Sequence, residues 1–159
     1  MNKTMKRFAV GILLLLLLVP LVACTASNGQ NPIDFNKKYI LSENDYLVFH
    51  SDGTGYREYK NVYENSSNPE YNYTQSGRIS FAWRESSNGA VYLFRLSEEY
   101  YADHTEGKSL PMISGPIHFS DEFCTYTYYT QYGDNTRQYV KEGSNLEKLL
   151  KEAKEQKTA

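Results

Sequence analysis

RISFAWRESSNGAVYLFRL, residues 78–96, is the stretch that decides the fold. Its first part alternates strictly: Ile79, Phe81 and Trp83 fall on one face of an extended chain, and polar side chains fall on the other. A period of two indicates a half-buried β-strand, so we expect these three side chains to face a core. Asn88-Gly89 then supplies the positive-φ positions that tight turns need. The stretch therefore predicts an antiparallel hairpin of strands 78–85 and 90–96.

The second strand of this hairpin has a less regular pattern. Tyr92, Phe94 and Leu96 form a row like that of the first strand, and we expect this row to face the core. Val91 and Leu93 make the other face apolar as well.

Similar runs, separated by turn residues, occupy most of the chain. Asp52-Gly53 and Gly133-Asp134-Asn135 mark two more hairpin turns. The expected strands are 37–42, 46–50, 55–63, 116–119, 123–132 and 136–141, with a further edge strand at 99–103. This pattern predicts an all-β fold, an antiparallel meander of about eight strands.

Only the end of the chain has helical periodicity. Ser144-Asn145-Leu146-Glu147 is a capping-box pattern. It is followed by Leu149, Leu150 and Ala153 on the same stripe as Leu146. We expect a C-terminal amphipathic helix over residues 144–157, docked on the sheet through its leucines.

Three segments carry a resemblance to a known fold family: Phe49-His50-Ser51-Asp52-Gly53-Thr54-Gly55-Tyr56, Phe81-Ala82-Trp83 and Tyr139-Val140-Lys141. With the succession of hairpins, they resemble the small lipocalin-like domains of bacterial lipoproteins of unassigned function. The resemblance implies a lipocalin-like β-barrel over residues 34–143.

The N-terminus resembles a bacterial lipoprotein signal. Lys3, Lys6 and Arg7 precede the apolar run Phe8–Val19, and Leu21-Val22-Ala23-Cys24 then looks like a lipobox. The apolar run is shorter than the about 20 residues that a membrane span needs. The resemblance implies a signal peptide at 1–23, a diacylglycerol cysteine at Cys24 with a further acyl chain such as palmitate, and a lipid-anchored polar tether at 24–33. The expected location is the extracytoplasmic side of the cell membrane or the outer membrane.

Composition limits the classes of partner. Loss of residues 1–23 removes three basic residues and no acidic one, so the 17 basic and 19 acidic residues of the chain become 14 and 19. Nucleic acids and anionic lipids attract clusters of Lys and Arg, so an acidic domain favours neither as its main partner. The expected lipid contact is the acylated Cys24 itself.

Signatures of catalysis and of metal binding are weak. Glu98, Glu99, Asp103 and His104 form the most metal-like group, but an exposed hairpin rim explains the same residues. The three histidines are far apart, and no nucleophile motif accompanies them. If Cys24 carries lipid, Cys124 has no disulfide partner, and its strand context favours a small buried side chain. We therefore expect no enzyme, no metal and no cofactor.

Tyrosine is the most distinctive residue type in the chain, with fifteen copies. Five of them crowd residues 56–73, a segment that also contains Asn, Ser and Glu, namely Tyr56, Tyr59, Tyr63, Tyr71 and Tyr73. Tyrosine offers a large apolar area with a polar tip, which suits recognition of a protein or a glycan. It is also a favoured residue on half-buried strand faces, so a purely structural role remains an alternative.

The preferred functional hypothesis is a membrane-anchored, non-catalytic binding or envelope-associated module. A barrel that carries a small apolar ligand in its interior is one alternative, because eight strands can either pack solid or enclose one small molecule. A small envelope enzyme is the other alternative.

Overall fold

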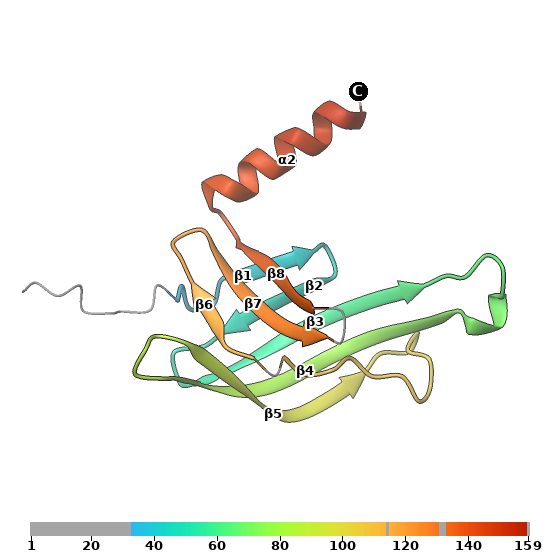
Figure 1. Ribbon diagram of the computed structural model, residues 1–159, viewed down its shortest axis with the longest axis horizontal. Helices are drawn as coiled ribbons and strands as arrows, with labels where there is room; N and C mark the ends of the chain where they lie inside the picture. Colours follow the sequence, from blue (N-terminus) through green and yellow to red (C-terminus); the bar gives the residue numbers. More distant parts are fainter. Residues whose placement is uncertain (1–32, 114, 131–132, 159) are drawn as a thin grey trace, which may run out of the picture. The chain divides into compact units, whose positions relative to one another are not determined.

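Eight antiparallel strands close into a barrel, and a helix follows the last strand (Figure 1). The structure is a computed structural model that describes residues 33–113, 115–130 and 133–158. The strands are β1 (Lys38–Ser42), β2 (Asp45–Phe49), β3 (Thr54–Tyr63), β4 (Tyr73–Glu85), β5 (Val91–Tyr100), β6 (Ile117–Phe119), β7 (Phe123–Thr130) and β8 (Gly133–Lys141). Each strand pairs with the next in sequence, and β1 pairs with β8. The predicted all-β barrel with a C-terminal helix is confirmed.

The β4–β5 hairpin forms as predicted and is longer than predicted. Gly89 has a φ of 80°, as the Asn-Gly turn requires. Ser80 pairs with Ser97, whereas Phe81 pairs with Arg95. This arrangement leaves Leu96 as the extra residue of a β-bulge, which shifts the register between the two halves of the hairpin.

The two strands of this hairpin differ in how well their faces were predicted. On β4, Ile79 and Phe81 are fully buried, as expected, and Trp83 is half-buried. On β5, the expected row is on the wrong face: Tyr92, Phe94 and Leu96 are 39%, 53% and 63% exposed. Val91 and Leu93 face the core instead, because Leu93 pairs directly with Trp83, and directly paired residues share a face.

Aromatic rings fill the centre of the barrel. Phe119 makes edge contacts with Tyr39 and with Phe49, both at 5.2 Å between ring centroids. Phe49 also packs against Phe81 at 5.5 Å. Val91, Ile117 and Cys124 are fully buried in the same cluster.

Among the described residues, β5 and β6 pair only at Val91 and Ile117, so the barrel is weakly closed there. Residues 105–113 of the connection between these strands are here named the strap, and Arg95 Nη2 of β5 donates to the Leu110 carbonyl of the strap at 3.0 Å. Leu110 and Ile113 of the strap are buried, and Leu110 packs with Tyr59 and Ile79 in a second, smaller core. Of the edge strand expected at 99–103, only residues 99 and 100 are in a strand, as the end of β5.

A buried ion pair joins β2 to β3 inside the barrel. Arg57 Nε donates to Asp45 Oδ1 at 2.8 Å, and Arg57 Nη2 donates to Asp45 Oδ2 at 2.6 Å. Both side chains are nearly inaccessible to solvent. The bidentate geometry satisfies both carboxylate oxygens, which a buried charge requires.

The β7–β8 hairpin turns at a different place from the one predicted. Gly133, Asp134 and Asn135 lie within β8, and Gly133 pairs with Thr130. The expected turn residues are therefore the first residues of the strand.

The C-terminal helix α2 (Asn145–Thr158) starts as its capping pattern predicts. Glu147 N–H donates to Ser144 Oγ at 3.1 Å, and the Glu147 carboxylate accepts from Gly143 N–H at 2.8 Å. Glu147 also pairs with Lys151 at 2.7 Å, the expected i, i+4 ion pair. The start of the helix is therefore well fixed.

The expected docking of this helix is wrong beyond its first turn. Leu146 is half-buried and its N–H donates to Glu122 Oε2 at 3.1 Å, but Leu149 and Leu150 are 61% and 45% exposed. The rest of the helix extends away from the strands (Figure 1). The leucines therefore do not hold α2 against the sheet.

Candidate functional site

The five candidate tyrosines do not form one surface. Tyr63, Tyr71 and Tyr73 gather at the tip of the long β3–β4 hairpin, which extends past β2 and β5 (Figure 1). Tyr59 lies inside the barrel, and Tyr56 lies on the outer face of β3. Three of the five thus lie together at the hairpin tip, where Tyr63 and Tyr71 are exposed and Tyr73 is half-buried.

At the hairpin tip, two tyrosines stack across the strand pair. Tyr63 and Tyr73 are directly paired residues, and their rings stack at 5.1 Å with an interplanar angle of 19°. Tyr71 follows in the short 3-10 helix η1 (Pro69–Tyr71) and is 61% exposed. Lys108 of the strap places its Nζ 4.8 Å from the centre of the Tyr73 ring. We name Tyr63, Tyr71, Tyr73 and Lys108 the hairpin-tip surface.

Asparagine side chains hold the loop at this tip. Asn65 Oδ1 accepts from the N–H groups of Ser67 and Asn68, both at 3.0 Å. Asn72 Oδ1 accepts from Asn65 N–H at 2.6 Å. These bonds fix the conformation of the loop that carries Tyr71. The side-chain oxygens of Asn65 and Asn72 therefore have a structural role in the loop.

The strap braces the hairpin from one side. Thr105 N–H donates to the Thr74 carbonyl at 2.9 Å, and Thr74 N–H donates to Thr105 Oγ1 at 2.8 Å. The tyrosines, Glu70 and Lys108 line an open hollow of about 450 Å³. The hollow combines flat aromatic faces with one acidic and one basic side chain, Glu70 and Lys108.

Tyr56 belongs to a different surface. Its ring meets that of Tyr46 at 6.4 Å, and the Arg78 guanidinium lies 4.5 Å from its centre. Arg78 in turn pairs with Glu58 at 2.9 Å. These contacts form a half-buried ladder across the outer faces of β2, β3 and β4, so Tyr56 has a structural role there.

The assignment of Tyr59 to a recognition surface is wrong. Its side chain is 1% exposed, and its hydroxyl donates to Glu98 Oε1 at 2.7 Å. Burial, together with the hydrogen bond to Glu98, raises the pKa of Tyr59 above its usual range. Tyr59 is two residues after Arg57 in β3, so the two side chains lie on the same inward face. The alternation of β3 in the sequence could therefore have predicted that Tyr59 is buried.

Asp103 and His104, from the acidic and histidine group near the end of β5, make structural contacts with residues of β3, β4 and β5. Asp103 pairs with Lys60 at 2.6 Å and accepts a hydrogen bond from Ser76. His104 stacks on Tyr100 at 4.1 Å, and its Nδ1 accepts from Ser76 N–H at 2.9 Å. Nowhere in the described ranges do three His, Cys, Asp or Glu side chains converge as metal ligands do.

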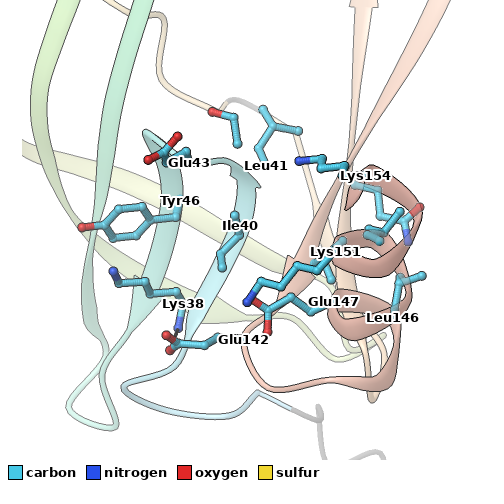
Figure 2. A pocket seen from close by; sticks show the side chains of 14 residues that line it. Lys38, Ile40, Leu41, Glu43, Tyr46, Glu142, Leu146, Glu147, Lys151 and Lys154 are labelled. Carbon is cyan, nitrogen blue, oxygen red and sulfur yellow. Dashed lines mark hydrogen bonds and ion pairs between the residues drawn. The ribbon is translucent and has the colours of Figure 1, made fainter. Parts of the chain in front are cut away.

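A groove between α2 and the barrel was not anticipated from the sequence. Its volume is about 590 Å³, and side chains of β1, β2, β8 and α2 line it (Figure 2). Ile40, Val140, Leu146 and Leu150 supply apolar area. The groove exists because α2 is fixed only at its first turn, so Ile40 of β1 and Val140 of β8 are left half-buried on the outer face of the barrel.

Charges of both signs surround this groove. Figure 2 shows Lys38 beside Glu142 on one wall, and Glu147 beside Lys151 on the helix. Lys154 lies at the upper end in this view, and Glu43 lies on the β1–β2 side. Since acids and bases alternate, the groove has no single charge that would select a charged ligand.

The residues that predict a lipid anchor are not covered by the structure. The signal peptide at 1–23, Cys24 and all of the tether except Ile33 lie outside the described residues. Ile33 packs against the main core. None of the helices within the described ranges has the length and apolar content to cross a membrane.

Comparison with known proteins identifies no relative. Neither protein-family models, nor curated proteins, nor solved structures match this chain.

Proposed function

We propose that this chain is a membrane-anchored extracytoplasmic lipoprotein and acts as a non-catalytic binding module. The hairpin-tip surface is its contact site, and its partner is a protein or a glycan of the cell envelope. The stacked pair of Tyr63 and Tyr73 beside exposed Tyr71 is the observation that carries the proposal.

The exposure of these tyrosines supports a binding role. Tyr63 and Tyr71 are 46% and 61% exposed, and neither belongs to the two buried core clusters. Aromatic side chains leave apolar area in water when they are exposed, so a partner that covers them gains free energy. Stacking and the braced loop also fix the rings in advance, which lowers the entropy cost of binding.

The packed centre of the barrel supports this role over that of a carrier of apolar molecules. Tyr39, Phe49, Phe81 and Phe119 contact one another where a carrier would hold its ligand. A ligand of any size would have to displace these rings.

The anchor is tested separately from the contact site. Lipid on Cys24 adds the mass of its acyl chains to a chain that begins at residue 24. We expect Cys24→Ser to abolish this modification and to move the protein from the detergent phase to the aqueous phase. Intact mass of the purified protein is the measurement, and an unmodified Cys24 would contradict the lipoprotein assignment.

The contact site is tested by removing its aromatic faces. We expect the triple variant Tyr63→Ser, Tyr71→Ser, Tyr73→Ser to lose a partner that the wild-type chain retains from envelope extract. The matched control replaces three exposed aromatic residues elsewhere: Tyr92→Ser, Phe94→Ser and Tyr101→Ser. Extract treated with protease or with periodate distinguishes a protein partner from a glycan.

Two results would contradict the proposal. If the triple variant keeps every partner of the wild type, the site lies elsewhere. If the triple variant unfolds while the control stays folded, the tyrosines stabilise the hairpin and are not a contact surface.

A further inference from the structure

A small cavity lies between the strap and the barrel wall, away from the hairpin-tip surface. Its volume is about 140 Å³. Strap residues 110–113 form one side, and Arg57, Tyr126, Arg137 and Tyr139 of β3, β7 and β8 form the other. The apolar side and the polar side therefore face each other across the cavity.

Tyr139 contributes an unused hydrogen-bond donor. Its side chain is 0% exposed, and its hydroxyl oxygen has no hydrogen-bond partner among the described residues. A buried hydroxyl without a partner is unfavourable, and such groups are rare in folded proteins. Burial raises the pKa of Tyr139 above its usual range, so the hydroxyl keeps its proton and remains a donor.

Arg57 contributes a second buried donor. The bonds to Asp45 use Nε and Nη2, and they leave Nη1 for another acceptor. Arg57 is 4% exposed, so this nitrogen is shielded from bulk water.

The charge of the lining favours an anion. Among its described lining residues the cavity has two guanidinium groups, from Arg57 and Arg137, and no carboxylate. Asp45, which pairs with Arg57, is not one of the lining residues. A carboxylate accepts from guanidinium and phenol donors and would satisfy them at once.

We propose that this cavity binds the carboxylate of a small organic acid, with Tyr139 Oη and Arg57 Nη1 as donors and with the strap covering the hydrocarbon part. An engineered apolar cavity of about 150 Å³ holds a molecule the size of benzene, so acids of about three to five carbons fit. This site is independent of the contact site at the hairpin tip.

The test uses the full chain purified in detergent, with sodium isobutyrate as the probe and nuclear magnetic resonance titration as the measurement. We expect saturable shifts of the Arg57 side chain and of the amides of residues 110, 113 and 139. Tyr139→Phe removes only the hydroxyl and should weaken isobutyrate binding at least tenfold without loss of the fold. Tyr56→Phe, which removes a hydroxyl on the outer face, should leave the affinity unchanged.

Isobutyramide, which has the same shape without the charge, provides the second comparison and should bind at least tenfold more weakly. Equal binding of the amide would overturn the assignment to a carboxylate. Equal binding by wild type and Tyr139→Phe, shifts that map to another part of the chain, or no saturable shift with isobutyrate would overturn the site itself. In the last case ordered water is the partner of Tyr139.

Discussion

Arg57 and Asp45 form a bidentate ion pair inside the barrel, with Nη2 of Arg57 2.6 Å from Oδ2 of Asp45. Asp45→Ala would leave a buried guanidinium without a partner, and we expect it to lower the free energy of unfolding by about 3–5 kcal/mol. The double variant Asp45→Leu, Arg57→Met removes both charges and should be close to wild type or more stable. Urea unfolding of the three proteins measures both effects. A loss below about 1 kcal/mol in the single variant would show that water reaches the pair.

The inward face of β4 gives a second prediction. Phe81 is fully buried, so Phe81→Ala should cost about 3–5 kcal/mol of unfolding free energy. Trp83 is half-buried, but its Nε1 donates to the carbonyls of His50 and Thr54 at 3.1 and 3.0 Å. We expect Trp83→Ala to cost about 3 kcal/mol as well. Exposed Arg84 is the control, with a cost below about 0.5 kcal/mol for Arg84→Ala. Equal denaturation midpoints for the three variants would mean that the faces of β4 are reversed.

The alternation of β4 and the Asn-Gly turn were sufficient to predict the central hairpin. On β5 the pattern could not decide the faces, because residues 91–94 and 96 are all apolar. The decision depends on partners far along the chain: Val91 and Leu93 share a core cluster with Ile113, at the end of the strap, and with Ile117 of β6. The bulge at Leu96 also changes the register, and no local sequence signal marks it.

The faces of β5 can be tested directly. Leu93 is 9% exposed and Phe94 is 53% exposed, although the two are adjacent and both apolar. We expect Leu93→Ala to cost about 2–5 kcal/mol and Phe94→Ala to cost less than about 1 kcal/mol. Thermal or urea unfolding measures both. The reverse order of costs would restore the face assignment made from the sequence.

The candidate site was only partly predictable for a similar reason. A cluster of tyrosines in sequence indicated residues 56–73, and Tyr63 and Tyr73 indeed meet across the hairpin. Within the same segment, strand alternation places Tyr59 on the inward face, where it bonds to Glu98. Glu98 lies 39 residues further along the chain, so no local pattern reveals this contact. The groove beside α2 was missed because helical periodicity predicts an apolar stripe but not whether a surface covers it.

Three fully buried tyrosines, Tyr39, Tyr59 and Tyr139, should make the barrel sensitive to alkaline pH. Burial raises the pKa of Tyr39 to about 12, and it raises the pKa of Tyr59 and of Tyr139 above the usual range. In the unfolded chain a tyrosine has a pKa near 10. Between these values the unfolded chain loses phenol protons that the folded chain keeps, so unfolding releases protons. Stability is therefore constant below about pH 10 with respect to these groups and falls as pH rises above it.

Urea unfolding at a series of pH values measures this loss. Each phenol that stays protonated only in the folded state lowers the free energy of unfolding by up to about 1.4 kcal/mol per pH unit above pH 10. Tyr39→Phe removes one such group, so we expect the free energy of unfolding to fall less steeply with pH between pH 10 and 12. The same variant loses the hydrogen bond from Asp34 N–H to Tyr39 Oη, which lowers its stability at neutral pH. Tyrosinate absorbance of the folded protein provides the independent check. If Tyr39, Tyr59 and Tyr139 ionise near pH 10 while the circular dichroism of the barrel is unchanged, their hydroxyls are open to water and these side chains are not buried.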